Sequence, residues 1–132
     1  MKIESYTYTG EAMKRVYENE KWTIGVKNWK PGSDPSMIDC LERHNKTDEL
    51  FVLVHGSCVL VCAEETENGL RFDAVEMKPG AVYNIPQNLW HNAITGKDAK
   101  LIVIEDVSTG MSNSEILQLN EEQITLVRGF WK

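Results

Sequence analysis

The sequence predicts an all-β protein, built as a β-sandwich or a small barrel, and three observations support this. Short runs rich in β-branched and aromatic residues, with alternating apolar and polar positions, recur between residues 21 and 107. Turn-forming pairs such as Gly56-Ser57 and Asn68-Gly69 separate these runs. No stretch of residues 38–107 shows a helical period of comparable strength. Roughly eight to ten strands of this length and spacing are typical of those two architectures.

The strand-like runs follow one another along the chain, and most of them end at a polar or glycine-containing turn. They cover residues 21–29, 38–44, 49–55, 58–63, 70–77, 81–85, 89–95 and 100–107. In the first run, Trp22, Ile24 and Val26 share one side, because successive side chains of a strand point to opposite faces. The run at 49–55 is strongly β-forming, since five apolar residues stand in a row there.

The two ends of the chain carry different patterns. Residues 10–19 are expected to hold a short helix with Met13, Val16 and Tyr17 facing inward. Near the other end, Asn120 followed by two glutamates and Gln123 predicts an N-cap with a capping box, which opens a short helix through residue 127. The aromatic side chains of residues 130 and 131 follow it, and we expect them to dock on the domain or on a second subunit.

Length and composition limit the classes of protein to which the chain can belong. With 132 residues and 15.0 kDa, it is expected to form a single domain over residues 1–132. A net charge of −6 and scattered Lys and Arg argue against a nucleic-acid partner. No apolar run has the length of a membrane span, and no signal peptide is evident. Together with an odd number of cysteines, three, this predicts a cytoplasmic protein without membrane contact.

A first group of polar side chains is expected to point into the barrel. Ile38, Cys40, Glu42 and His44 fall on one face of their strand, and that face is the interior if the first two are buried. Glu49 opens the next strand in phase with its inward apolar residues. Buried carboxylates without partners are costly, so something must compensate these two glutamates.

His91 supplies a second imidazole from a later strand. It is in phase with Leu89 and Ala93, and Pro86 forms a corner before it. If the two segments adjoin, two nitrogens and two carboxylates converge, a set suited to Mn²⁺, Fe²⁺, Ni²⁺ or Zn²⁺. Two ionised glutamates would neutralise a divalent ion, which would disfavour a further anionic ligand. Because residues two apart on a strand share a face, Cys40, Phe51 and Tyr83 are also candidates for the lining of the same pocket.

The chain resembles the cupin superfamily over about residues 38–107. The first cupin motif is approximately G-x5-H-x-H-x3/4-E-x6-G, and the second is approximately G-x5-P-x-G-x2-H-x3-N. These motifs correspond here to about residues 36–56 and about residues 80–95. The positions that match in identity and spacing are His44, Glu49, Gly56, Gly80, Pro86 and His91.

The resemblance implies a small cupin: a double-stranded β-helix, or jelly-roll barrel, with a short terminal helix and often a homodimer. It makes His44, Glu49 and His91 three of the usual four metal ligands. Glu42 stands where the first metal-binding histidine usually is, so we take it as the candidate fourth ligand. This exchange alters the charge and redox tuning of the site, which places specific dioxygenase or oxalate-type chemistry in doubt. The chain also has Ser36, Asn88 and Thr95 where the motifs have Gly, Gly and Asn.

Two functions stay open at this point. In one, a metal-dependent enzyme of isomerase, lyase or oxygenase type acts on a small polar metabolite. In the other, a metal-free cupin binds or senses a small molecule, and His44 and His91 are hydrogen-bonded residues of its cavity. A serine or cysteine triad has no support, because no nucleophile stands at a readable spacing from either histidine.

Overall fold

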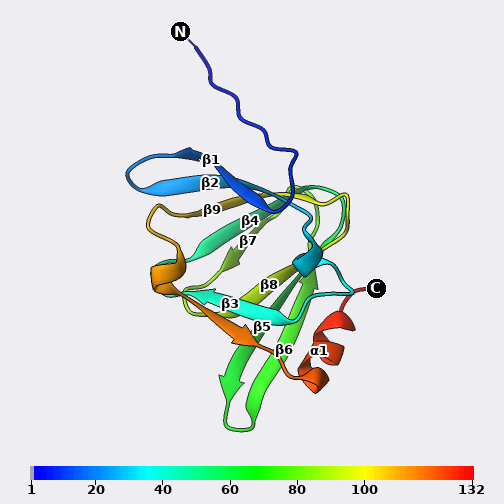
Figure 1. Ribbon diagram of the computed structural model, residues 1–132. Helices are drawn as coiled ribbons and strands as arrows, with labels where there is room; N and C mark the ends of the chain where they lie inside the picture. Colours follow the sequence, from blue (N-terminus) through cyan, green and yellow to red (C-terminus); the bar gives the residue numbers. More distant parts are fainter. Residues whose placement is uncertain (1) are drawn as a thin grey trace.

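Two five-stranded antiparallel sheets lie face to face in the computed structural model, which describes residues 2–132 (Figure 1). The first sheet has the strand order β1-β2-β9-β4-β7 and the second has the order β10-β3-β8-β5-β6. The elements are β1 (Met13–Glu18), β2 (Trp22–Asn28), η1 (Pro31–Ser33), β3 (Cys40–His44), β4 (Glu49–His55), β5 (Cys58–Thr66), β6 (Gly69–Glu76), β7 (Val82–Ile85), β8 (Trp90–Thr95), β9 (Lys100–Asp106), η2 (Met111–Asn113), β10 (Ser114–Gln118) and α1 (Glu121–Arg128).

The chain passes repeatedly between the two sheets, so strands far apart in sequence become neighbours. For example, β4 lies between β7 and β9, while β3 lies between β8 and β10. This interleaving of two antiparallel sheets is the double-stranded β-helix, and it confirms the predicted all-β jelly roll.

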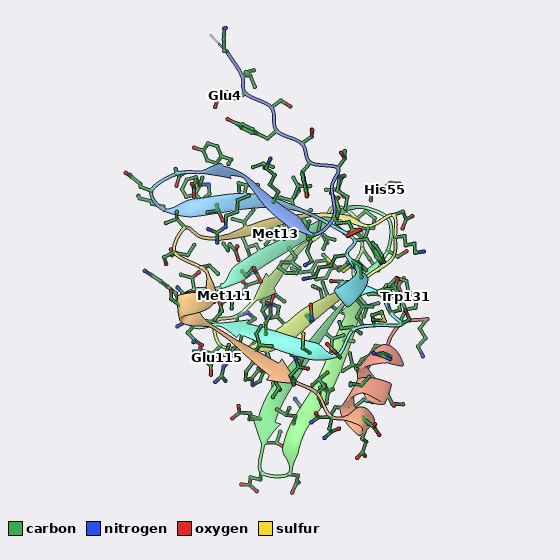
Figure 2. The ribbon with its side chains drawn as sticks, in the orientation of Figure 1. Glu4, Met13, His55, Met111, Glu115 and Trp131 are labelled. Atoms are coloured by element: carbon green, nitrogen blue, oxygen red, sulfur yellow. The ribbon has the colours of Figure 1, made fainter. Side chains whose placement is uncertain are left out.

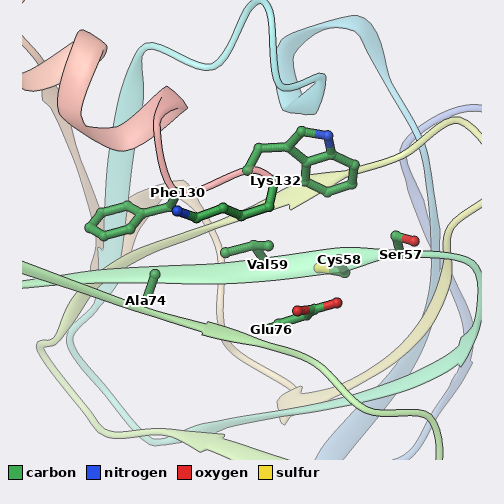
Figure 3. Close-up of a pocket in the computed structure, with 8 residues that line it drawn as sticks. Ser57, Cys58, Val59, Ala74, Glu76, Phe130 and Lys132 are labelled. Carbon is green, nitrogen blue, oxygen red and sulfur yellow. The ribbon is translucent and has the colours of Figure 1, made fainter.

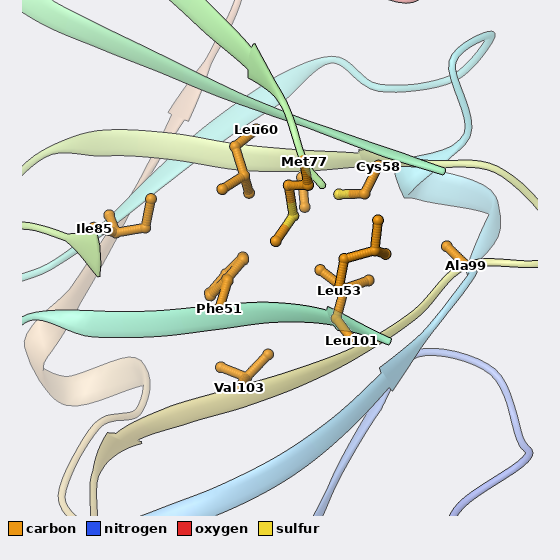
Figure 4. Packing of buried hydrophobic residues seen from close by; sticks show 10 residues of the cluster. Phe51, Leu53, Cys58, Leu60, Met77, Ile85, Ala99, Leu101 and Val103 are labelled. Atoms are coloured by element: carbon orange, nitrogen blue, oxygen red, sulfur yellow. The ribbon is translucent and has the colours of Figure 1, made fainter. Parts of the chain in front are cut away.

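The main core lies between the two sheets (Figure 4). It is formed by alternate residues of the strands, because every second side chain of a strand faces inward. Phe51 and Leu53 of β4 pack there with Leu101 and Val103 of β9, and each of these side chains is at most 4% exposed. The apolar pattern of the sequence therefore determines which face of each strand points into the barrel, and with it the positions of the polar side chains in the same phase.

A second apolar cluster lies on the outer face of the second sheet, under α1. Leu41 of β3 and Ile94 of β8 contribute to it with Val127 of the helix. The helix begins as predicted: the Asn120 side chain accepts a hydrogen bond from the backbone N–H of Gln123, whose own side chain accepts one from the N–H of Asn120. Phe130 and the following tryptophan pack against this cluster, which confirms docking on the domain itself.

The structure corrects three expectations about the elements. Residues 10–19 are not helical, because Met13–Glu18 forms β1, which pairs with β2 after Ala12 takes a left-handed turn conformation (φ 65°). The β5–β6 hairpin extends further than predicted, and its two-residue turn is Glu67-Asn68. A tenth strand, β10, was not predicted; its sequence, SEILQ, is too polar and too short to show an alternating signal.

Two further features bear on the class of protein. Among residues 2–132, the longest helix has eight residues, so none has the length or apolar character of a membrane span. Cys40, Cys58 and Cys62 are all free thiols, and burial raises the pKa of the Cys58 thiol to about 12, which makes this side chain an unreactive part of the core.

Candidate metal centre

The four predicted ligands come together between the sheets. Glu42 and His44 lie on β3 and His91 on the adjacent β8, where Glu42 and His91 are direct cross-strand partners. Glu49, at the start of β4, approaches them from the other sheet. Its Oε1 atom lies 3.0 Å from His91 Nε2 and 3.5 Å from His44 Nε2. Glu42 Oε1 is 3.9 Å from the same His44 nitrogen.

The alternation of side chains along strands predicted the direction of these four side chains correctly, but the reason used for β3 was partly wrong. Ile38 was expected to share the interior face with Glu42 and His44, yet it precedes β3 and packs in the second cluster, under α1. Leu41 belongs to that cluster as well. Because β3 is covered on both faces, burial of a neighbouring apolar residue could not by itself identify the barrel side.

Each imidazole is held through its second ring nitrogen. His91 Nδ1 lies 2.9 Å from the carbonyl oxygen of Leu89. Because a carbonyl can only accept, Nδ1 carries the proton, and in the neutral ring Nε2 has a free lone pair. His44 Nδ1 lies 2.8 Å from Ser114 Oγ on β10. The donor Nδ1 of His91 is the usual arrangement behind a metal-binding imidazole, and the Ser114 hydroxyl can accept the same kind of hydrogen bond from His44.

The resulting donor set fits a cation. His91 Nε2 and Glu49 Oε1 are 3.0 Å apart and are both acceptors when the imidazole is neutral and the carboxylate is ionised. Such a contact is unfavourable unless a proton or a metal ion lies at it. Burial acts to raise the pKa of Glu49, but hydrogen bonds from His44 and His91 outweigh it and hold that pKa well below its usual value. The Glu49 hydrogen bond in turn raises the pKa of His44.

A third carboxylate borders this cluster, and it was not predicted from the sequence. Glu105 of β9 is 6% exposed, and its carboxylate lies within 4.8 Å of the ligand atoms of His44 and Glu49. Burial and the neighbouring Glu49 raise the pKa of Glu105 to about 8, so it holds a proton at neutral pH. Arg15 Nη2 contacts it at 3.2 Å and also donates to the backbone oxygen of Thr109.

The signal for Glu105 was present in the sequence. Leu101, Val103 and Glu105 occupy alternate positions of β9, so the phase that buries the first two also turns the carboxylate inward. The same reasoning identified Glu42 and His44. Arg15 had no such signal, because its segment was expected to be helical.

An open cavity of about 310 Å³ leads to the cluster. Phe51 lines it, as predicted, and Met13 and Met111 border it from β1 and η2 (Figure 2). Cys40 and Tyr83 are not among its lining residues. Cys40 Sγ lies 3.9 Å from Asn92 Nδ2, and the Tyr83 hydroxyl accepts a hydrogen bond from the Lys78 backbone at the border of a different hollow.

A separate hollow lies where the chain end crosses β5 and β6 (Figure 3). Ser57, Val59 and Phe130 are among its lining residues, together with the carboxylate of Glu76 and the chain-terminal Lys132. It contains no imidazole. The groups able to hold a metal are therefore associated with the cavity at Glu49, and this second hollow reflects the docking of the C-terminal aromatics.

Two of the motif positions have a structural explanation. Asn88, where the cupin motif has glycine, has a φ of 69°, a left-handed conformation that asparagine tolerates better than most residues. Its N–H donates to the backbone oxygen of His44 at 3.0 Å, which connects the two motifs. Gly56 has a φ of 79°, and a Cβ there would lie 2.5 Å from the Asp98 carbonyl oxygen. The replacement of the motif glycine by Asn88 thus preserves the backbone geometry of the site.

Comparison with known proteins supports the fold. No family model matches the sequence. A solved RmlC-like cupin family protein with a double-stranded β-helix fold, from Methanocaldococcus jannaschii, superposes with a TM-score of 0.56 at 12% identity, over 80% of this chain and 92% of that one. This chain has the double-stranded β-helix fold of cupins. Oxalate decarboxylase from Bacillus subtilis superposes on this chain with a TM-score of 0.53 at 20% identity, over 83% of this chain and 28% of that one. Mn(II) centres are described for that enzyme.

One curated protein gives a sequence match to this chain. Ureidoglycolate lyase from Rhodobacter capsulatus is 31% identical over 85 residues, which cover 61% of this chain and 53% of that protein. The chain therefore spans about half the length of the curated relative that it matches.

Proposed function

We propose that this cupin binds one divalent metal ion through Glu42, His44, Glu49 and His91 and acts on a small polar metabolite in the adjoining cavity. The observation that carries the proposal is the convergence of two anchored imidazole nitrogens on one buried carboxylate oxygen. The donor set suits Mn, Fe, Ni or Zn. When bound, such an ion supplies a Lewis acid and a template for an oxygen-bearing ligand.

Among the protein's own groups, Glu105 favours an enzyme over a passive binding module. It borders the cavity and holds a proton near neutral pH, because burial and Glu49 raise its pKa. A carboxylic acid in that state can donate a proton to a ligand and take one back. Arg15 keeps this carboxyl in place. The similarity to ureidoglycolate lyase supports a lyase among the expected reaction types.

Metal content per subunit is the direct test of this proposal. Protein purified without an affinity tag or chelator should contain close to one Mn, Fe, Ni or Zn per chain by elemental analysis. His44→Ala and His91→Ala should each lose the metal while keeping the β-sheet circular dichroism spectrum. The matched control is His55→Ala, since His55 is exposed and bonds the Asp98 carbonyl away from the cavity.

The outcome also distinguishes the two functions left open by the sequence. Native protein that stays free of metal after reconstitution would support the alternative of a metal-free binding cupin. Full metal content in both the His44 and His91 variants would reject the proposed ligands.

We further propose that two copies of the chain associate through the outer face of the first sheet. Cross-strand pairing places apolar side chains there in two rows. The rows are Ile102, Val52 and Val82, and beside them Ile24, Ile104 and Leu50. Val26 continues the first row but is only 4% exposed, so it adds nothing to the uncovered surface. Val82 is 64% exposed, and among residues 2–132 no helix covers this face (Figure 1). A second copy would cover such an apolar surface.

Val52→Glu should convert the dimer to a monomer, because it places a charge in the middle of the apolar rows. Sedimentation equilibrium should give about twice 15.0 kDa for the native chain and 15.0 kDa for the variant. Val75→Glu, an exposed valine on the other sheet, is the control and should stay dimeric. A monomeric native chain, or dissociation by the control alone, would contradict this interface.

A further inference from the structure

Lys27 places an ammonium group in the wall of the same cavity. It lies on β2, directly opposite Met13 of β1 and Leu101 of β9. Because Leu101 points into the barrel core, its direct cross-strand partner points to the same side. Lys27 accordingly lines the cavity together with Glu42 and Glu49.

The ammonium group of Lys27 has no partner within the part of the chain that the structure describes. No acceptor lies within hydrogen-bond distance, and no carboxylate lies within 4.0 Å. Lys100, one strand away, provides the contrast, since its Nζ donates to the Tyr8 carbonyl at 2.6 Å and to Asn28 Oδ1 at 2.9 Å. Lys27 is half-buried, so its ammonium group stands unpaired at the cavity wall, where it is free to bind an anion that enters the cavity.

The surroundings of Lys27 strengthen this argument. Removal from water lowers its pKa, and the nearby Lys30 lowers it further, while Glu42 and Glu49 oppose the shift only in part. Lys30 also lines the cavity. The third cation there, Arg15, is occupied by Glu105 and the Thr109 backbone. Two ammonium groups therefore face the cavity from the side of β2, while Glu42 and His44 face it from β3 and Glu49 faces it from β4.

We propose that Lys27, assisted by Lys30, binds the carboxylate of an anionic substrate whose other end reaches the metal centre. The substrate class is then a small acid that has one carboxylate for Lys27 and, separate from it, a hydroxy- or oxo-carboxylate group for the metal centre. This inference rests on the proposed metal-dependent function, which it deepens. It also revises the expectation that two glutamates at the metal disfavour an anionic ligand, because the anion binds to the lysines.

A carboxylate fits this site better than a phosphate. Phosphate sites in proteins typically combine several backbone N–H groups or a bidentate guanidinium. Here the guanidinium of Arg15 is already bound to Glu105, and the cavity offers isolated ammonium groups on flexible stems.

The test compares two acids that differ in one carboxylate. Isothermal titration of the Mn²⁺-loaded full chain is carried out with malate, which has two carboxylates, and with 2-hydroxybutyrate, which has one. Lys27→Met keeps the length and apolar stem of the side chain and removes the charge. It should weaken malate binding roughly 10- to 100-fold and leave 2-hydroxybutyrate binding unchanged. Lys27→Arg should restore part of the malate affinity, and Lys78→Met, at an exposed turn, should have no effect.

Metal content and melting temperature, measured on the same samples, separate the two proposals. Lys27→Met should keep its metal and melt no lower than the native chain, because an unpaired, half-buried charge has been removed. Malate binding that is lost with Lys27 in a chain that holds no metal would keep this inference and reject the metal centre. Equal malate affinity in native and Lys27→Met protein, or no binding of either acid, would overturn it. Inorganic phosphate binding more tightly than malate through Lys27 would overturn the carboxylate assignment.

Discussion

Glu49→Gln is expected to lower the affinity for a divalent ion by roughly 100-fold or more, a loss comparable to those expected for His44→Ala and His91→Ala. Even residues that only support metal ligands typically contribute 10- to 100-fold. Glu49 is the carboxylate on which both imidazoles converge, at 3.0 and 3.5 Å. Glutamine has the same shape but brings no charge, and its amide NH₂ is a donor that repels a cation.

The adjacent acid provides a matched control for this experiment. Asp48 is exposed, and its two carboxylate oxygens accept hydrogen bonds from the Gln87 backbone and the Asn84 side chain. Asp48→Asn should therefore leave the metal affinity unchanged. Titration of chelator-stripped protein with Mn²⁺ or Zn²⁺ measures both variants. Equal affinity in native and Glu49→Gln protein would remove Glu49 from the site, and equal losses in both variants would indicate nonspecific electrostatic attraction.

The alternation of side chains on strands predicted which candidate ligands share a face, but it did not identify which face of β3 points into the barrel. It correctly placed Glu42 and His44 on a common face, because alternation is a local property that needs no knowledge of strand pairing. The bounds predicted for β4, residues 49–55, agree with the structure. Which strands become neighbours depends on the global topology, so the convergence of two segments about 40 residues apart followed only from the resemblance to cupins.

Lys27 shows where this reasoning fails. Trp22, Ile24 and Val26 are the apolar phase of β2, so by pattern alone their side should face the core. The structure turns that side outward, where Ile24 lies beside Ile104, and turns Lys27 into the barrel. A strand that is apolar on its outer face misleads the alternation rule. The five consecutive apolar residues of β4 reveal the same situation, since both of its faces carry side chains suited to burial.

Raising the pH from about 5 to about 8 is expected to destabilise the metal-free protein. The pKa of Glu105 is raised to about 8, so between its ordinary value and that pH the folded chain binds more protons than the unfolded chain, and stability falls as pH rises. The raised pKa of His44 acts in the same direction, because its contribution is lost as pH rises through the folded-state pKa. The pKa of Glu49 is lowered, so its contribution to stability is complete once the pH exceeds the ordinary pKa of a glutamate. Glu49 therefore does not change the stability between pH 5 and pH 8.

Urea denaturation of chelator-treated protein at several pH values measures this slope, and Glu105→Gln is the informative variant. It should flatten the dependence, because glutamine cannot titrate. Lys27, whose lowered pKa acts in the opposite direction, is present in both proteins, so their difference isolates Glu105. A slope that is identical in the two proteins would show that Glu105 is not the protonated carboxyl of the cavity.

Bound metal should reverse the fall in stability with rising pH. This reversal distinguishes a metal centre from a hydrogen-bonded cavity. Binding an ion requires Glu49 and neutral imidazoles and releases the protons held by the cluster, so affinity for the ion rises with pH. Stabilisation by a fixed excess of Mn²⁺ or Zn²⁺ should therefore be smallest near pH 5 and largest near pH 8, where the metal-free protein is weakest. A metal-free cavity would show no such crossing, because nothing would replace the protons that His44 and Glu105 lose.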